Sequence, residues 1–314
     1  MTVIDLKTMR EATVPPAAVV CLGNFDGVHL GHMALVRETL KKKAELVSST
    51  PEIAAAACFF RILPSDFLHA TTIPRLTTFD EKLALFAESG LDYAFVINFE
   101  NVGAFSPSEF VQRILQEALH CVFAVCGFNF RFGKNAAGDA TLLTHLMSGN
   151  VSVVPPVTVN GRVICSSAVR QMIADGDVHL VPAILGRPYS LCVDVLHGKA
   201  LGRTLGIPTI NQNFPKALAV PQNGIYITKT TIDGTEYPSV SNIGTRPSVN
   251  DGTFINCETH IIGFQGDLYG KRIRVQFMQR LRDEVRFPNT DALKTQIQND
   301  IQKTKEYYKE ALFL

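Results

Sequence analysis

The stretch GNFDGVHLGH, Gly23 to His32, joins an apolar run to a predicted helix. The apolar run, Ala17 to Leu22, is continuous, which is typical of a buried strand in a parallel sheet. Met33 to Lys43 follows as the helix. Gly23 and Gly27 allow the backbone to turn tightly and to approach a ligand closely. We therefore predict a strand, a binding loop and a helix in that order.

Two histidines stand at the start of this helix. His29 and His32 are three residues apart, so both can face the same way. Free N–H groups at a helix N-terminus attract anions, and two imidazoles beside them indicate a phosphate site. The alternative is that Asp26 and His29 only cap the helix and that His32 lies on the surface. The grouping of these residues directly after a strand favours the phosphate site.

The composition is that of a globular protein with room for two hydrophobic cores. The 314 residues are 46% hydrophobic and 19% charged. A net charge of +1 gives no general attraction for nucleic acid or a membrane surface. The sequence shows neither a signal peptide nor an apolar run of membrane-spanning length. Seven cysteines without a CxxC motif favour reduced core residues and a cytoplasmic location.

Apolar runs and capped helices alternate through the first half of the chain. Capping boxes at Thr78–Glu81 and Ser106–Glu109 each precede a predicted helix, and Asp139 caps a third. Continuous apolar strands separated by helices predict a parallel sheet that is covered on both faces. Ligands of such sheets bind beyond the carboxyl ends of the strands. The expected strands are 17–22, 53–60, 93–99, 122–126 and 151–154.

Two further segments carry groups suited to a nucleotide. GFNFRFG, Gly127 to Gly133, follows the strand that ends at Cys126. Its glycines and Asn129 suit nucleotide contacts, whereas its phenylalanines either line the pocket or pack beneath it. ICSSAVR, which contains Ser166, Ser167 and Arg170, starts a predicted helix whose hydroxyls and guanidinium can reach phosphates. The alternative for this second segment is an ordinary capped helix with an exposed arginine.

The pattern changes after Leu185 to Tyr189, where Gly186 and Pro188 indicate a domain boundary. Short β-rich runs follow, and Asp233-Gly234 between two of them predicts a hairpin. Regularly spaced short strands predict a small antiparallel barrel. The polar segment from Thr290 to about Ala311 is expected to form a helix on its outside.

The quoted motifs resemble those of one family. GNFDGVHLGH resembles the (H/T)xGH signature of nucleotidyltransferases, in the form found in bacterial bifunctional riboflavin kinase/FMN adenylyltransferases. GFNFRFG and ICSSAVR resemble that family's GxNFxFG and ISSTxIR segments, and IPTIN resembles the PTAN motif of riboflavin kinases. The resemblance implies an α/β plus all-β protein. Residues 1–184 would form a Rossmann-like nucleotidyltransferase domain with a parallel sheet, and 185–314 an antiparallel β-barrel kinase domain with a C-terminal helix.

For the first domain the resemblance implies transfer of AMP from ATP to FMN, which gives FAD. Because the phosphate of FMN is already a nucleophile, alignment and charge stabilisation would supply the catalysis, together with Mg²⁺. His29, His32 and Arg170 are the expected catalytic groups. The expected ATP-binding residues are Gly23, Asn24, Phe25, Asp26, Gly27, His29, Gly31, His32, Gly127, Asn129, Ser166, Ser167 and Arg170.

For the second domain the resemblance implies ATP-dependent phosphorylation of the ribityl 5′-hydroxyl of riboflavin. Glu258 is the expected base, and Thr209 and Asn211 would hold Mg²⁺ through oxygen atoms. The alternatives are a solvated strand carboxylate and a turn after Pro208. The expected ATP- and flavin-binding residues are Gly198, Lys199, Gly202, Gly206, Pro208, Thr209, Asn211, Asn242 and Arg282.

One segment departs from the family pattern. FRILPSDF, Phe60 to Phe67, stands where the family carries a loop like Glu-Pro-x-Pro near the flavin. The departure raises an alternative function: a riboflavin kinase whose adenylyltransferase half is weakened or altered in specificity. A flavin-binding module without turnover and a cytidylyltransferase are further alternatives. The expected partners are small molecules, namely riboflavin, FMN and ATP, and weak self-association is left open.

Overall fold

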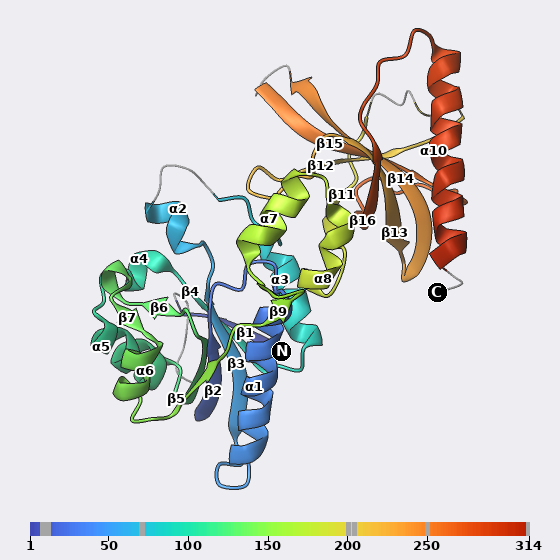
Figure 1. The fold of residues 1–314 in the computed structure, drawn as a ribbon. Coiled ribbons are helices and arrows are strands. Elements are labelled where there is room, and N and C mark those ends of the chain that lie inside the picture. The colour runs from blue at the N-terminus through green and yellow to red at the C-terminus, as the bar shows by residue number, and fades with distance from the viewer. Residues whose placement is uncertain (7–13, 69–72, 199–201, 203–205, 249–251, 312–314) are drawn as a thin grey trace. The chain divides into compact units, whose positions relative to one another are not determined.

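The computed structural model describes residues 1–6, 14–68, 73–198, 202, 206–248 and 252–311 (Figure 1). Its contacts divide the chain into two compact units, Met1–Ser166 and Ser167–Leu314. None of the helices in the described ranges combines the length and the hydrophobicity that a membrane crossing requires.

Within the described residues, the first unit is built on a six-stranded parallel sheet. Its strands are β1 (Thr2–Asp5), β2 (Ala17–Leu22), β3 (Ile53–Phe60), β4 (Tyr93–Ile97), β5 (Cys121–Gly127) and β8 (Val151–Val154). They lie in the order β1-β4-β3-β2-β5-β8, and each neighbouring pair is parallel. Every residue of β2 is buried. The predicted parallel sheet is therefore confirmed.

Helices cover both faces of this sheet (Figure 1). The even-numbered residues of β2 share a core with η2 (Phe110–Ala118) and α6 (Ala140–Leu146). The odd-numbered residues share another with α1 (Leu30–Leu46) and α3 (Phe79–Glu88). The remaining elements are short: α2 (Pro64–Leu68), α4 (Phe99–Val102), α5 (Pro107–Glu109), β6 (Arg131–Phe132), η3 (Lys134–Ala136), β7 (Gly138–Asp139), β9 (Thr158–Val159) and β10 (Arg162–Val163).

Capping boxes begin α3 and α5 where the sequence predicts them. The Glu81 N–H donates to the Thr78 hydroxyl at 3.2 Å, and the Glu81 carboxylate accepts the Thr78 N–H at 3.0 Å. Ser106 and Glu109 make the same reciprocal pair. The helix after Glu109 continues as η2 in the π form, with hydrogen bonds that span five residues.

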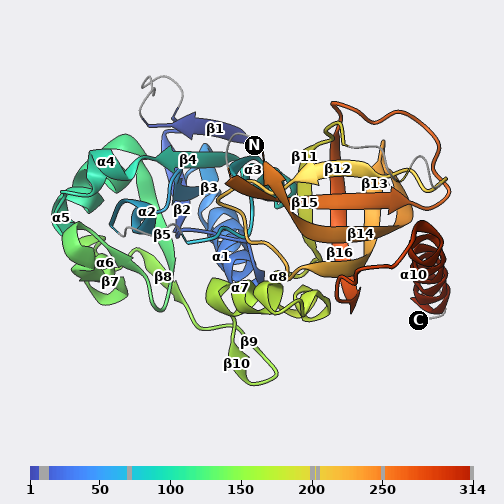
Figure 2. The same cartoon turned by 90° about the horizontal axis from the view of Figure 1, so that it is seen from above.

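Six strands in the described part of the second unit form an antiparallel barrel (Figure 2). They are β11 (Tyr189–Asp194), β12 (Ile210–Asn213), β13 (Gly224–Ile232), β14 (Thr235–Ser248), β15 (Gly252–Ile261) and β16 (Arg272–Arg282), in the order β11-β16-β13-β14-β15-β12. A bridge between Leu196 and Asn211 brings the two outer strands together. Asp233 and Gly234 have φ values of 47° and 81°, as the predicted hairpin requires. The barrel prediction is confirmed.

Short helices precede the barrel within the second unit. They are α7 (Ser166–Ala174), η4 (Val178–Leu180) and α8 (Pro182–Leu185). The Gln222 N–H donates to the carbonyl of Ile173 in α7, and a Cβ on Gly176 would lie 2.6 Å from Arg280 Cδ. These contacts group the segment after Ser166 with the barrel. The domain boundary at 184/185 stays a prediction.

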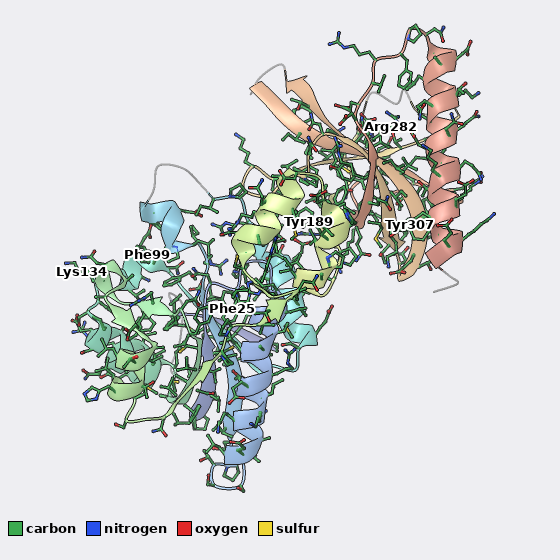
Figure 3. The ribbon with its side chains drawn as sticks, viewed as in Figure 1. Phe25, Phe99, Lys134, Tyr189, Arg282 and Tyr307 are labelled. Atoms are coloured by element: carbon green, nitrogen blue, oxygen red, sulfur yellow. The ribbon has the colours of Figure 1, made fainter. Side chains whose placement is uncertain are left out.

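The C-terminal helix α10 (Thr290–Ala311) is joined to the barrel by an ion pair whose carboxylate is buried. Arg282, at the end of β16, donates from Nη2 to Asp300 Oδ2 at 2.7 Å, and from Nε to both carboxylate oxygens (Figure 3). Asp300 is almost fully buried, and Gln296 also donates to its carboxylate. Removal of one partner of such a pair typically costs about 3–5 kcal/mol. The pair therefore fixes the predicted C-terminal helix to the barrel.

Candidate functional site

The two loops singled out in the first unit leave adjacent strands at the same edge of the sheet. From β2 the chain runs outward through β3 and β4, and it then returns to place β5 on the other side of β2. Leu22 at the end of β2 is paired with Cys126 near the end of β5. Ligands of α/β proteins bind at such switch points of strand order.

His29 and His32 cap the first turn of α1 through each other's side chains. The His32 N–H donates to His29 Nδ1 at 3.2 Å, and the His29 N–H donates to His32 Nδ1 at 3.3 Å. The rings stack with their centroids 3.5 Å apart and their planes 13° apart. Because each Nδ1 accepts a hydrogen bond, the proton of each neutral imidazole belongs on Nε2, which becomes a donor. The histidines thus cap the helix and also present donor nitrogens.

The loop between β2 and α1 has a left-handed backbone. The φ angles of Phe25, Gly27 and Val28 are 50°, 84° and 42°. Such values are uncommon for residues with side chains, and Val28 is a clear outlier because it is β-branched. Burial offsets this strain, since Phe25 (labelled in Figure 3) and Val28 are both buried. The Phe25 ring also meets the His32 ring edge-on, with 5.2 Å between centroids. The loop shape is therefore fixed by packing.

Distant segments also hydrogen-bond to this loop. The Asp26 carboxylate accepts the N–H of Leu76 at 2.9 Å, and the Ser166 hydroxyl donates to the Asp26 carbonyl at 2.9 Å. The amine of Lys82 donates to the carbonyl of Asn24 at 2.8 Å. Ser166, an expected phosphate ligand, therefore hydrogen-bonds to the backbone of the loop in this structure.

Gly31 makes room for the stacked imidazoles. A Cβ at this position would lie 3.1 Å from both Cε1 and Nδ1 of His29. That separation is shorter than ordinary van der Waals contact, so the His29 ring would have to move. The glycine of the GH pair therefore keeps the imidazole in place.

We expect Gly31→Ala to lower FMN adenylylation about tenfold, because a small displacement of an aligned group is costly in rate. Alanine is the better helix former by about 1 kcal/mol, so the melting temperature should not fall. Steady-state rates with FMN and ATP, together with a thermal melt, check both statements. An unchanged adenylylation rate would show that the His29 ring position is unimportant.

In the loop after β5, two of the phenylalanines pack against the core and one is exposed to solvent. Phe130 packs against the core and stacks on the buried Phe132, with 5.6 Å between ring centroids. Phe128 is 50% exposed. Asn129 is exposed, and its Oδ1 would lie 3.4 Å from a Cβ placed on Gly127. Phe130 and Phe132 therefore pack beneath the loop, whereas Phe128 and Asn129 remain accessible.

Two of the expected phosphate ligands in the ICSSAVR segment fall in the other unit. Ser167 and Arg170 lie on α7, and the contacts of the chain group them with the barrel. Their expected roles in phosphate binding stay predictions.

The segment that departs from the family pattern contains paired charges. Arg61 donates to Asp5 at 3.0 Å, and Arg75 donates to Asp66. Asp66 Oδ1, Arg75 Nε and Thr77 Oγ1 are buried without a hydrogen-bond partner among the described residues. Such atoms are normally satisfied in folded proteins. The region after β3 therefore has unused hydrogen-bonding capacity.

Sequence reasoning missed Lys82, a buried cation next to the loop. Lys82 is only 5% exposed, and its amine lies 5.1 Å from the centroid of the Phe59 ring. Burial lowers its pKa from 10.5 to about 8; the charge of Asp26 opposes this shift, and that of Arg75 adds to it. The spacing of Phe79, Lys82 and Phe86 places all three on one face of α3, and this pattern indicates that Lys82 is buried with the two phenylalanines.

In the second unit three expected residues share one face of the barrel wall. Glu258 on β15 is paired with Asn211 on β12 and with Asn242 on β14. Direct partners in antiparallel strands project to the same side, so these side chains form a row. Thr259 points the other way, into the barrel, where its hydroxyl lies 2.7 Å from that of Ser241. The structure thus brings Glu258, Asn211 and Asn242 together.

Gly198, which follows β11, lies against this row. A Cβ on Gly198 would lie 2.4 Å from Asn211 Nδ2, so a larger residue here would displace the Asn211 amide. A Cβ on Gly202 would lie 3.4 Å from the Thr209 hydroxyl and 2.4 Å from the Ile207 carbonyl. The Pro208 carbonyl accepts a hydrogen bond from His260 Nδ1 at 2.8 Å. Gly206 has a φ of 74°, and Lys199 lies outside the described residues.

Arg282 has a protein partner in this structure. Its Nε and Nη2 bind Asp300, and its Nη1 donates to the carbonyl of Asp283 at 2.9 Å. The expected contact of Arg282 with phosphate or flavin stays a prediction, and its observed role is structural.

Family models match both halves of the chain. The FAD synthetase model matches residues 11–168 and the riboflavin kinase model residues 185–308. A bifunctional riboflavin kinase/FMN adenylyltransferase of Pseudomonas fluorescens is 35% identical over 287 residues, 90% of each chain. The enzyme of the same name from Escherichia coli strain K12 is 34% identical over 296 residues, 92% of each chain.

A solved structure has the same fold over nearly the whole length. It is the crystal structure described as that of a macrolide-efflux protein from Streptococcus pneumoniae, with a TM-score of 0.86 and 26% identity. The match covers 97% of this chain and 99% of the other.

The two family models occur in the predicted order, with adenylyl transfer first and the kinase second. Riboflavin, FMN and ATP are therefore substrates, and FAD is the final product. The chain belongs to the family of bifunctional riboflavin kinase/FMN adenylyltransferases, which phosphorylate riboflavin to FMN and adenylylate FMN to FAD.

Proposed function

We propose that adenylyl transfer takes place at the Gly23–His32 loop and that His29 and His32 stabilise the transferring phosphates. The observation that carries this proposal is the mutual capping of the two histidines through Nδ1. It makes both Nε2 atoms hydrogen-bond donors next to a helix N-terminus, where an anion is already favoured. Fixed donors of this kind act without reorganisation during the reaction.

The reaction needs no covalent intermediate. An oxygen of the FMN phosphate attacks the α-phosphorus of ATP, the bond to the bridging oxygen breaks, and pyrophosphate leaves. Negative charge accumulates on the bridging oxygen and on the leaving group. The imidazole donors and backbone N–H groups of the loop would hydrogen-bond to these oxygens. Arg170, Ser167 and Asn129 are proposed as further nucleotide contacts, on the strength of their motifs.

We propose Glu258 as the base of the kinase reaction. Its carboxylate would accept the proton of the ribityl 5′-hydroxyl while that oxygen attacks the γ-phosphorus of ATP and ADP leaves. The support is its place in the row with Asn211 and Asn242. Asn242 Oδ1 is buried and has no partner among the described atoms, so it can accept a hydrogen bond from a ligand.

Thr209 and Asn211 fit a magnesium ion in the kinase site. Both offer neutral oxygen atoms, and no group of three or more His, Cys, Asp or Glu side chains able to hold a metal occurs among the described residues. Neutral side-chain oxygens are hard donors of the kind that Mg²⁺ accepts, and substrate phosphates and waters would complete its coordination. The close approach of Gly198 to the Asn211 amide fixes one of these side chains. When bound, the ion would neutralise charge on the nucleotide phosphates.

The proposed location is the cytoplasm. Its support is that all seven cysteines are free thiols and that five of them are buried.

Nitrogen-15 NMR of the histidine side chains tests the assignment of the imidazoles. We expect His29 and His32 to carry their protons on Nε2, and we expect both signals to shift when ATP and Mg²⁺ are added. The exposed His145 serves as the control that should not respond. Unchanged His29 and His32 signals at saturating ATP and FMN would refute the proposal.

A further inference from the structure

We propose that Lys82 is a positioning residue for adenylyl transfer: by holding the carbonyl of Asn24, it aims the N–H of Phe25 at the nucleotide phosphates. This inference rests on the proposed function of the Gly23–His32 loop. Lys82 lies on α3, about fifty residues from the loop in sequence, and no motif drew attention to it.

The contact of Lys82 with the loop is short and buried. Its Nζ donates to the Asn24 carbonyl at 2.8 Å, and the side chain is almost fully removed from solvent. The Phe59 ring lies beside the amine and supplies an apolar wall. A buried ammonium is stable only with a close polar partner, so this side chain has little freedom to leave the carbonyl.

Because the peptide bond is planar, the hydrogen bond from Lys82 to the Asn24 carbonyl also fixes the direction of the Phe25 N–H. In a trans peptide the C=O and the following N–H point in opposite directions. Since the Asn24 carbonyl points toward Lys82, the Phe25 N–H points away from it. The Asp26 carbonyl is held in the same way by the Ser166 hydroxyl, which directs the Gly27 N–H away from Ser166. Two loop N–H groups thus take their direction from side-chain anchors, of which Lys82 is buried and Ser166 is half-buried.

The strain in the loop explains why an anchor is needed. Phe25 and Val28 both have positive φ, which side-chain-bearing residues adopt only when the surroundings impose it. Phe25 also packs against His32, so a rotation of the Asn24–Phe25 peptide would disturb the stacked imidazoles. Lys82 therefore acts on the histidines through the loop and has no contact with the reacting atoms in this role.

The charge of Lys82 changes within a pH range that an activity assay can cover. The charged groups that face it are Asp26 from the loop and Arg75 from the segment before α3, and Glu81 precedes it in the helix. Burial lowers the pKa of Lys82 to about 8, so the ammonium becomes a neutral amine between about pH 7 and 9. The hydrogen bond to Asn24 then loses its charge assistance.

Stability and activity should consequently respond to pH in opposite directions. A lysine whose pKa is lowered from 10.5 to about 8 binds fewer protons folded than unfolded between those values, so its contribution to stability rises with pH there. Adenylylation should instead fall above about pH 8, because the loop is held less firmly. If Lys82 served only to stabilise the fold, adenylylation and the free energy of unfolding would change with pH in the same direction.

The test uses the full chain with Lys82→Met, Lys82→Gln and Lys82→Arg, and with Lys41→Met as an exposed control. FMN adenylylation is measured with added FMN and varied ATP, from about pH 7 to 9. Riboflavin phosphorylation by the same preparation reports that the chain is folded. Lys82→Gln keeps an N–H donor but removes the charge. It replaces Lys82→Met in the adenylylation assay if that variant does not fold.

We expect Lys82→Met and Lys82→Gln to lower kcat/KM for ATP in adenylylation about 10- to 100-fold, with kinase activity intact. Lys82→Arg should recover most of the rate and remove the decline above pH 8, because guanidinium stays charged. Full adenylylation by folded Lys82→Met and Lys82→Gln would overturn the inference. So would a decline above pH 8 that persists unchanged in Lys82→Arg. If His32→Ala also retains full adenylylation, the proposed function itself fails; if only the Lys82 variants do, this inference alone fails.

Discussion

Replacement of His32 by alanine should reduce FMN adenylylation about 100- to 1000-fold and leave riboflavin phosphorylation at the level of the unmodified protein. Loss of one fixed hydrogen-bond donor in a transition-state site has an effect of that size. Alanine also removes the acceptor for the His29 N–H and the ring that stacks on His29. The measurement is the initial rate of FAD formation from FMN and ATP.

A second variant separates chemistry from helix capping. His32→Gln places at the third helical position the residue type that commonly completes a capping box, so the start of α1 should remain capped. It should be as inactive as His32→Ala in adenylylation but closer to the unmodified protein in melting temperature. His145→Ala removes an exposed histidine of the same unit and should change neither activity. Recovery of adenylylation in His32→Gln would mean that the imidazole serves only as a cap.

Glu258→Gln should reduce riboflavin phosphorylation about 100- to 10,000-fold, because an amide cannot accept the proton of the ribityl hydroxyl. Glutamine has nearly the same shape as glutamate, so the row with Asn211 and Asn242 should persist. Adenylylation of added FMN should continue at its normal rate. The readout is FMN formation from riboflavin and ATP, followed by chromatography.

Glu236→Gln provides the matched control for that variant. Glu236 lies on β14 in the same barrel, and its exposed carboxylate pairs with Lys229 at 2.8 Å. Exposed ion pairs contribute about 0–1 kcal/mol to stability, so this change should alter neither reaction nor the fold. Kinase activity that survives in Glu258→Gln would remove Glu258 from the role of base.

The central strands could be predicted because their sequences are apolar throughout. A parallel sheet covered on both faces requires such runs, and β2 and β3 are buried along nearly their full length. The edge strand β1 (Thr2–Asp5) was missed, since it is short, contains polar residues and is mostly exposed. It is a strand because it pairs with β4, and residues 2–5 give no local sign of that partner.

The histidine pair shows what spacing can and cannot reveal. Because His29 and His32 are three positions apart, the sequence predicts that their rings lie on one side of the helix start. Their mutual capping depends on the φ and ψ angles of the loop, and these depend on packing of Phe25 and Val28 in the core. Motif reasoning therefore found the residues, whereas the assignment of Nδ1 and Nε2 required the structure.

The helical face of Lys82 could be predicted from sequence, but its hydrogen bond to Asn24 could not, because the acceptor is a backbone carbonyl that does not depend on residue identity. Ser166 illustrates the same difficulty. Its phosphate contact stays a prediction, and the hydrogen bond of its hydroxyl to the carbonyl of Asp26 could not be predicted from the motif. Arg282 also has an anchor that the motif did not indicate, the carboxylate of Asp300.

The most direct test of two separate sites is one chromatographic time course of riboflavin, FMN and FAD, run on the unmodified protein, His32→Ala and Glu258→Gln. We predict that His32→Ala converts riboflavin to FMN, which accumulates without FAD. Glu258→Gln should leave riboflavin unconverted and still turn added FMN into FAD. The account would be contradicted if either folded variant lost both reactions or if His32→Ala formed FAD at the normal rate.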